Sequence, residues 1–262
     1  MTLKKKLSNL KSILRKYPGA VVAFSGGVDS TLLLKVATEV LKEKVIAVTA
    51  VSPLYPKGEI ASARKITRLL GTEHWIIKSN ELANPLFIKN SRKRCFYCKI
   101  ELFQKLKAMA SIPGYPVLEA SNKSDLRDWR PGLSAAKKLG IKSPLIAAAL
   151  EKEEIRKLAK EFKLPNWNKP SMACLASRIP YGHAILGKTL LRIGRAENYL
   201  KKIGARQVRV RDYYPTARIE VAEKEFSKIL KMRGRVIKHF RKLGYKYIAL
   251  DLEGYRTGSL NR

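Results

Sequence analysis

Residues 21–34 have the sequence VVAFSGGVDSTLLL, and this stretch decides the fold. Its first part, 21–24, is an apolar, largely β-branched run that predicts a buried strand, and apolar residues recur at helical spacing through 29–41. A Ser-Gly-Gly turn joins the two segments. In a strand–turn–helix of this kind, backbone N–H groups and the positive end of the helix dipole face a bound anion. The stretch therefore predicts a phosphate-binding loop.

This loop is not a Walker loop, which requires Gly-x-x-x-x-Gly-Lys-Ser/Thr and so includes a lysine that is absent here. Its two glycines let backbone N–H groups approach a phosphate, and the hydroxyls of Ser25, Ser30 and Thr31 add donors. The alternative is a plain glycine-rich turn, which the strand before it and the helix after it disfavour. The candidate phosphate-binding residues are Ser25, Gly26, Gly27, Val28, Asp29 and Ser30.

Strands and helices alternate through the first part of the chain. The expected strands are 21–24, 44–51, 74–77 and 115–120, and the expected helices are 3–16, 29–41, 59–71, 95–110 and 151–162. This alternation predicts a Rossmann-like α/β fold, with a doubly wound parallel sheet that binds ligands at the carboxyl ends of its strands.

The pattern changes after residue 188. A helix at 188–203 is followed by two alternating strands within 205–221, two helices and a last strand at 245–252. These elements predict a small α+β domain. We therefore expect a phosphate-binding domain over 1–175 and a second domain over 176–262.

The composition is that of a globular chain with an unusual charge. Of its 262 residues, 54 are Lys or Arg and 21 are Asp or Glu, which gives a net charge of +33. Such a charge attracts RNA or a phosphorylated substrate, but a lysine-rich surface adapted to salt or heat has the same composition. Because no apolar run is long enough for a membrane span and no signal peptide is recognisable, we expect a cytoplasmic protein without a membrane partner.

Several motifs add a resemblance to a known family. The sequence SGGVDS resembles the pyrophosphate loop of the PP-loop superfamily, the N-type ATP pyrophosphatases. Further motifs stand in order along nearly the whole chain and resemble the LarE family of ATP-dependent sulfur transferases. They are RCFYCKIELF (94–103), RPG (130–132), SPL (143–145), KEEIRKLAKEFKLPNW (152–167), KPSMACLASRIPYG (169–182), VRVR (208–211), ARIEV (217–221) and LDLEGYRTGS (250–259).

The resemblance implies a reaction. ATP adenylylates each carboxylate of a pyridinium dicarboxylate mononucleotide, pyrophosphate leaves, and a sulfur nucleophile then produces a thiocarboxylate for a nickel-pincer cofactor. The loop would hold the β and γ phosphates of the leaving group, so a lysine for γ-phosphoryl transfer is not required. Asp29 is the candidate ligand of Mg²⁺, a cation that prefers carboxylate and phosphate oxygens. The resemblance also implies a homo-oligomer, with substrate binding and oligomerisation in the second domain.

The same resemblance nominates residues outside the loop. Arg209 and Arg211 are two apart on an expected strand and share one face, where bidentate bonds to phosphate or carboxylate are one interpretation and a solvated face is the other. The nucleotide candidates are Lys99 and Asn122, although ASN replaces the family's Gly-Thr-Asn turn. The substrate candidates are Ser177, Arg178, Glu197, Arg209, Arg211 and Glu220.

The three cysteines leave the sulfur source open. In the simplest form of the family, the cysteine at the position of Cys174 gives up its own sulfur, but this sequence adds Cys95 and Cys98 at a helix start. Three thiolates suit a [4Fe-4S] cluster that binds sulfide at its fourth iron, and we favour this hypothesis. The alternatives are sacrificial Cys174, a zinc site, a redox disulfide and inert thiols. His74 and His183 are possible fourth ligands, although core or surface roles suit them better.

Two other functions stay open at this stage. A tRNA thiolase would use the same loop and cysteines and would suit the charge of +33, but no RNA-binding module is recognisable. A non-catalytic iron–sulfur or nucleotide-sensing protein is the alternative outside the enzymes. An intact phosphate loop beside an arginine-rich second domain disfavours it.

Overall fold

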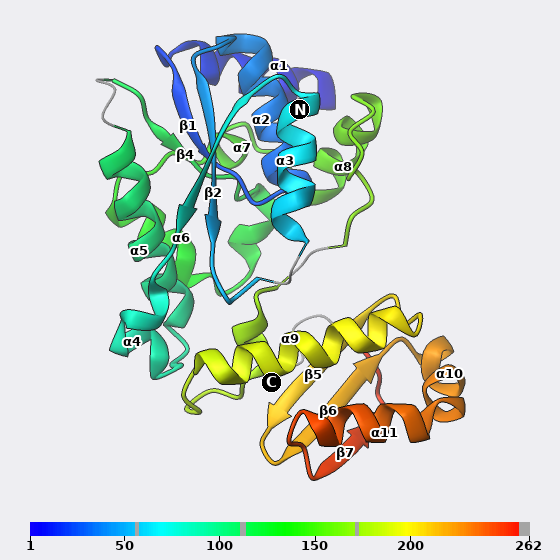
Figure 1. Cartoon of the computed structure of the whole chain (residues 1–262). Coiled ribbons are helices and arrows are strands. Elements are labelled where there is room, and N and C mark those ends of the chain that lie inside the picture. Colours follow the sequence, from blue (N-terminus) through cyan, green and yellow to red (C-terminus); the bar gives the residue numbers. More distant parts are fainter. Residues whose placement is uncertain (56–57, 111–113, 171–172, 257–262) are drawn as a thin grey trace. The chain divides into compact units, whose positions relative to one another are not determined.

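The computed structural model describes residues 1–55, 58–110, 114–170 and 173–256 (Figure 1). Residues 171–172 of the motif at 169–182 and residues 257–259 of the motif at 250–259 lie outside this description. The chain divides into two compact units. Unit 1 comprises Met1–Ser52, Lys57–Asn84 and Lys93–Met172, and unit 2 comprises Pro53–Pro56, Pro85–Arg92 and Ala173–Arg262.

Unit 1 is built on a four-stranded sheet with the order β3-β2-β1-β4, in which every pair is parallel. The strands are β1 (Ala20–Ala23), β2 (Val45–Val51), β3 (Glu73–Lys78) and β4 (Val117–Leu118). The first three lie within a residue of the expected ones. The fourth is shorter than expected because Pro116 has no N–H for the ladder and only accepts, from the N–H of Val21 at 3.0 Å.

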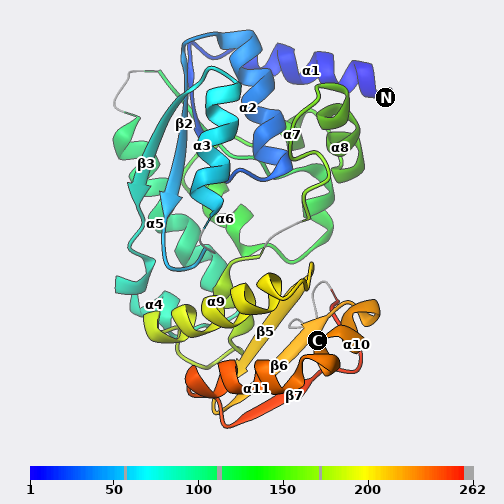
Figure 2. The same cartoon turned by 45° about the vertical axis from the view of Figure 1, so that its right-hand side comes forward.

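Helices cover both faces of this sheet (Figures 1 and 2). Side chains alternate along β1, so Val22 joins one hydrophobic cluster and Val21 the other. The cluster around Val22 includes α1 (Leu3–Arg15), α2 (Val28–Leu41), α3 (Glu59–Leu69), α7 (Pro144–Ala147) and α8 (Lys152–Glu161). The cluster around Val21 includes α5 (Arg94–Met109) and α6 (Pro131–Lys138). The doubly wound α/β fold is confirmed.

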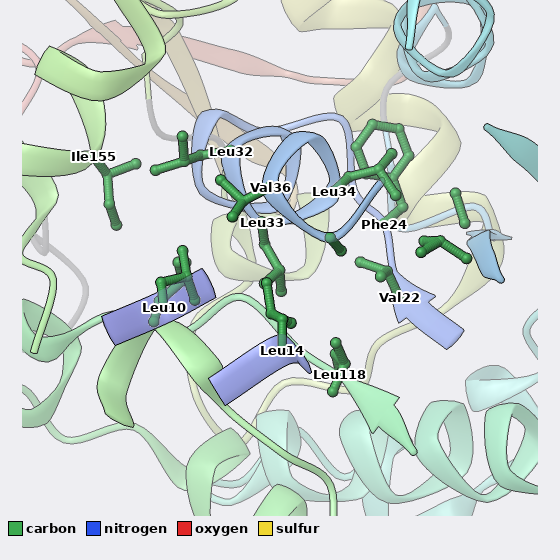
Figure 3. Close-up of a cluster of buried hydrophobic side chains, with 14 of the residues drawn as sticks. Leu10, Leu14, Val22, Phe24, Leu32, Leu33, Leu34, Val36, Leu118 and Ile155 are labelled. Atoms are coloured by element: carbon green, nitrogen blue, oxygen red, sulfur yellow. The ribbon is translucent and has the colours of Figure 1, made fainter. Parts of the chain in front are cut away.

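Helix α2 is the centre of the larger cluster. Its residues Leu32, Leu33 and Leu34 are all fully buried, as expected for a helix packed on several sides. Figure 3 shows Leu33 pointing toward Leu14 of α1. The same view shows Leu32 on the side of Ile155 of α8. The helix that begins at the phosphate loop is therefore fixed by the core.

Several short elements were not expected from the sequence. Helices α6 and α7 begin at Pro131 and Pro144, and proline at the first helical position is a recognisable start signal. The other short elements are η1 (Glu81–Ala83), α4 (Pro85–Ile88), η2 (Lys123–Arg127) and η3 (Leu175–Arg178). None of the helices in the described residues is long and apolar enough to cross a membrane.

Unit 2 has a three-stranded sheet of the order β5-β6-β7, with an antiparallel and a parallel pair. Its strands are β5 (Val208–Tyr213), β6 (Thr216–Val221) and β7 (Tyr247–Leu250). Its longer helices are α9 (Gly187–Lys202), α10 (Phe226–Lys231) and α11 (Arg233–Lys242), with η4 (Glu223–Glu225) before α10. The apolar face of β5, with Val208 and Val210, packs in a core with Phe240 of α11. The expected α+β arrangement is confirmed.

Candidate functional site

The phosphate loop lies between β1 and α2. Gly26 has φ of +68°, a left-handed conformation that favours glycine, and Gly27 is the N-cap residue of α2 and has no side chain to cap it. Ser25 Oγ accepts from the N–H of Gly27 at 3.3 Å and lies 3.1 Å from Ser30 Oγ. Ser30 Oγ donates to the carbonyl of Gly27 at 3.1 Å. The serines therefore brace the turn, and the N-terminus of α2 is left to bind an anion.

The sheet order brings a second loop to this point. Because β4 lies beside β1, the residues that follow both strands meet at the edge where the strand order reverses, which is where doubly wound sheets bind ligands. Asn122 follows β4, and its Nδ2 donates to Asp29 Oδ1 at 3.4 Å. Its Oδ1 accepts from the N–H of Ser124 at 3.0 Å, and Asp125 completes a capping box with Asn122. The structure thus brings the candidates Asp29 and Asn122 together.

A lysine that sequence reasoning missed also reaches this point. Lys152, the first residue of α8, places Nζ 2.5 Å from Asp29 Oδ2. The two residues are 123 positions apart in the sequence. The lysine occurs in the motif KEEIR, but its helical pattern indicated only a helix face, so no local signal connected it with Asp29.

Asn166 is a second missed residue. It is buried, and its Nδ2 donates to the carbonyl of Gly26 at 3.0 Å and to Thr31 Oγ1 at 2.9 Å. Its Oδ1 is also buried, without a hydrogen-bond partner among the described residues. Lys169 Nζ lies 3.5 Å from the same carbonyl of Gly26 and 2.8 Å from Glu59. The left-handed turn at Gly26 is therefore held by side chains from beyond α8.

Two cysteines lie at the start of α5. Cys95 is exposed and Cys98 is half-buried, and neither forms a disulfide in the described structure. Both lie in the first turns of a helix that begins at Arg94, within a residue of the expected start. Lys99 follows them, with Nζ 5.1 Å from the ring centre of Phe103. The third cysteine, Cys174, belongs to unit 2. Within the described ranges, no three side chains of His, Cys, Asp or Glu form a group that could hold a metal ion.

The two histidines considered as fourth ligands have other surroundings. Nε2 of His74 lies 2.8 Å from Thr49 Oγ1, and its Nδ1 lies 3.1 Å from Thr67 Oγ1. Burial, and secondarily the charge of Arg64, lower the pKa of His74. His183 is exposed. His74 therefore has the core role, because both of its ring nitrogens already have hydrogen-bond partners.

In unit 2, the candidate Arg178 is completely buried. Its Nε and Nη2 donate to the two oxygens of Glu197, at 2.8 and 3.0 Å. Its Nη1 donates to the carbonyls of Ala173 and Cys174, at 2.8 and 2.9 Å, and to Ser177 Oγ at 2.9 Å. One guanidinium therefore fixes the backbone that carries the Cys174 thiol.

A second buried pair lies beside the first. Arg211 binds both oxygens of Glu220, at 2.8 and 2.9 Å, and its Nη1 donates to the carbonyl of Ser177 at 2.6 Å. Glu197 Oε1 also accepts from the N–H of Val210 at 3.1 Å. Two strands and α9 thus hold η3 through four charged side chains, and the expected candidates Ser177, Arg178, Glu197, Arg211 and Glu220 come together.

Arg209 differs from the other two arginines. It is buried, and its guanidinium donates to the carbonyl of Val208 at 3.1 Å and to the hydroxyl of Tyr255 at 3.4 Å. Burial, and next the neighbouring charge of Arg178, lower the pKa of Arg209. No ion pair of the described residues includes it, whereas Arg178 and Arg211 both have one. This strand face is therefore buried and not solvated, and Arg209 forms no ion pair with a carboxylate of the residues that the structure describes.

The parallel sheet and the Ser-Gly-Gly-Val-Asp-Ser loop at its switch point define an ATP-dependent enzyme of the PP-loop class. A family model described as NAD synthase matches residues 3–96. The chain is 42% identical to an uncharacterized protein of Synechocystis sp., over 99% of this chain and 98% of that protein. It is 36% identical to the pyridinium-3,5-bisthiocarboxylic acid mononucleotide synthase of Lactiplantibacillus plantarum, over 99% of this chain and 95% of that protein.

A further relative, an uncharacterized protein of Methanocaldococcus jannaschii, is 31% identical over 98% of this chain and all of that protein. Together with the synthase of Lactiplantibacillus plantarum, these full-length similarities identify the family. The chain belongs to the LarE family of ATP-dependent sulfur transferases.

Proposed function

We propose that this protein converts the carboxylates of a pyridinium dicarboxylate mononucleotide to thiocarboxylates, in the biosynthesis of a nickel-pincer nucleotide cofactor. The Lactiplantibacillus plantarum relative is named as a synthase of a bisthiocarboxylic acid mononucleotide, which supports this substrate. A carboxylate is a poor electrophile, and adenylylation gives its oxygen a good leaving group.

The proposed reaction has two steps. First, a carboxylate oxygen of the substrate attacks the α-phosphorus of ATP, and the bond to the β-phosphate oxygen breaks, which releases pyrophosphate. Ser25, Ser30 and the N-terminus of α2 would bind the departing phosphates, and Asp29 would hold the Mg²⁺, which would neutralise their charge. Second, a sulfur nucleophile attacks the activated carbonyl carbon and AMP leaves. Water must be excluded between the steps, since it would hydrolyse the adenylate.

The observation that carries the proposal is the buried charge of Arg209 in the unit that also contains the Cys174 thiol. Arg178 and Arg211 each have a carboxylate partner and fix η3, whereas Arg209 has none among the described residues. A buried guanidinium without a counter-ion is costly, and a planar anion such as the substrate's phosphate or carboxylate relieves that cost by bidentate hydrogen bonds. We therefore assign Arg209 to anion binding, with Arg178, Arg211, Glu197, Glu220 and Ser177 as its frame. Substrate recognition, and with it the assembly of copies into a homo-oligomer, is proposed for unit 2.

For the sulfur source we propose Cys95, Cys98 and Cys174 together. The donor set suits a [4Fe-4S] cluster in its chemistry, since cysteine thiolates are the usual cluster ligands and two of the three cysteines are one helical turn apart on α5. A cluster held by three cysteines would supply, at its fourth iron, a sulfide from an external donor. Sacrificial loss of sulfur from Cys174 alone is the competing mechanism.

Release of pyrophosphate tests the proposed function. With ATP·Mg²⁺, the protein should release pyrophosphate when pyridinium-3,5-dicarboxylate mononucleotide is added and not when tRNA is added. Cys174→Ala should still release pyrophosphate but produce no thiocarboxylate, whereas Asp29→Ala should do neither. Release that depends on tRNA would identify a tRNA thiolase instead. No release with either acceptor would contradict the proposal and favour a non-catalytic protein.

A further inference from the structure

The phosphate loop has no lysine of its own, but a lysine lies on it in the folded chain. Lys152 Nζ is 2.5 Å from Asp29 Oδ2, in the first turn of α2. Both side chains are about a quarter exposed, at 25% and 24%, so the pair is accessible from solvent and only partly buried. An ion pair of this exposure is weak and can be exchanged for other partners.

The backbone around Lys152 is fixed toward the loop. The N–H of Lys152 donates to Ser124 Oγ at 3.1 Å, and the N–H of Lys123 donates to the carbonyl of Leu150 at 2.8 Å. Through these bonds, the start of α8 is tied to the segment after β4 that also contains Asn122. The position of Lys152 beside Asp29 is thus set by the sheet edge and not by the lysine side chain alone.

The location of Lys152 in its own helix is electrostatically unfavourable. It is the first residue of α8, where the positive end of the helix dipole repels a cation. The next two residues, Glu153 and Glu154, are acidic and are stabilised by the same dipole. Asp29, in contrast, lies where the dipole of α2 stabilises an anion. Proteins keep such a violation of a local rule mainly at functional sites. The N-terminus of α2 and the ammonium of Lys152 therefore meet at one carboxylate, and both would attract an anionic ligand.

We propose that Lys152 is the phosphate-binding lysine of this site and that it leaves Asp29 for ATP. The inference rests on the proposed role of Asp29 as a Mg²⁺ ligand. With ATP·Mg²⁺ bound, Asp29 would serve as a ligand of the metal ion, and its carboxylate would then attract Lys152 Nζ less strongly. The freed ammonium binds phosphate oxygens, for which a lysine acts as a point charge. Asp29 thus holds the lysine in the correct place until the nucleotide arrives.

The exchange predicts opposite changes in two affinities when Lys152 is removed. In Lys152→Met, ATP·Mg²⁺ measured by calorimetry should bind at least tenfold more weakly, or about 1.4 kcal/mol. Mn²⁺ alone, measured by the electron paramagnetic resonance signal of the free ion, should bind more tightly, because its competitor for Asp29 is gone. Lys152→Arg should recover most of the ATP affinity, since it keeps the charge.

A second ion pair that involves α8 offers a matched control. Lys6 of α1 contacts Glu154 of α8 at 2.7 Å and is also partly buried. Lys6→Met removes a comparable ion pair that has no contact with the loop, and both affinities should remain at the values of the unaltered protein. ATP affinity in Lys152→Met equal to that of the unaltered protein would overturn the inference. So would a parallel loss of both affinities, which would indicate a merely structural pair. Failure of the proposed function, in contrast, would appear in the unaltered protein as an absence of pyrophosphate release.

Discussion

The two units hold their functional charges in different ways. In unit 1, Asp29 and Lys152 are about a quarter exposed and meet through one close contact. In unit 2, Arg178 and Glu197 are 0% and 2% exposed and are joined by two hydrogen bonds. Exposed pairs contribute little to stability and exchange easily, whereas breaking a buried pair leaves an uncompensated charge. Unit 1 is therefore suited to exchange partners during nucleotide binding, and unit 2 to hold a fixed arrangement.

The largest expected effect is on the buried pair. Glu197→Gln keeps the shape of the side chain but leaves Arg178 charged and buried, so the free energy of unfolding should fall by about 3 kcal/mol or more. Glu39→Gln, at a half-exposed residue that pairs with Lys11 and Lys35, should lower it by less than about 1 kcal/mol. Urea denaturation measures both. Equal costs for the two variants would remove the proposed difference between the units.

In unit 2, replacement of Arg209 should weaken substrate binding without lowering the stability of the fold. Because no described carboxylate pairs with it and burial lowers its pKa, Arg209→Met should leave the free energy of unfolding unchanged or raise it. The same variant should bind the dicarboxylate mononucleotide at least about tenfold more weakly, by the loss of a charged hydrogen bond. Arg211→Met is the matched variant, and it should destabilise the fold. Calorimetry of the mononucleotide and urea denaturation give both readouts. A destabilised Arg209→Met with normal binding would make Arg209 structural.

Replacement of Asn166, which supports the phosphate loop of unit 1, should change both stability and ATP binding. Asn166→Ala removes the two bonds to Gly26 and Thr31, which should cost about 1–3 kcal/mol of stability and raise KM for ATP. Asn168→Ala, at an exposed neighbour, should change neither quantity. Pyrophosphate release at varied ATP concentration measures KM. If KM were the same in both variants, Asn166 would support the fold without positioning the loop.

The smallest expected effect is a dependence of stability on pH, which arises from one histidine in each unit, His74 in unit 1 and His239 in unit 2. Burial is the main cause that lowers the pKa of His74 and of His239 below the ordinary 6.5. The unfolded chain then binds more protons as the pH falls below about 6.5, so stability should be full above this value and decrease below it. All three tryptophans, at 75, 129 and 167, lie in unit 1, so their fluorescence reports its unfolding. Between pH 7.5 and 5.5, His74→Gln should reduce the decrease seen by fluorescence, whereas His239→Gln should not. An equal reduction in both would contradict the assignment.

The sequence predicted the features that depend on neighbours along the chain. The strand at 21–24, the glycine turn and the helix after it follow from local periodicity and dihedral preference, and the alternation of elements predicted the parallel sheet. The sheet order then explains why Asn122 reaches Asp29, because β4 lies beside β1. The strand, the turn and the helix needed no long-range information, whereas the contact between Asn122 and Asp29 depends on the sheet order.

The long-range contacts could not be predicted. Lys152 and Asn166 reach the loop from distant parts of the sequence. Lys152 is 123 positions from Asp29, and Asn166 is 140 positions from Gly26. In a chain with 54 lysines and arginines, no pattern indicates which cation meets which carboxylate. Asn90 is a further case, because Pro85–Arg92 belong to unit 2 although they lie within the expected first domain, 1–175. It is fully buried in unit 2, where its Nδ2 donates to the carbonyls of Pro180 and His183.

The most direct test of the account is the number of sulfur atoms transferred per chain by protein reconstituted without oxygen and supplied with sulfide. We expect about four irons per chain, several thiocarboxylates per chain and an unchanged intact mass. Cys95→Ser, Cys98→Ser and Cys174→Ser should each lose iron and turnover together. One sulfur per chain, with no iron and the loss of one H₂S from Cys174, would contradict the three-cysteine mechanism and establish Cys174 as the sulfur source.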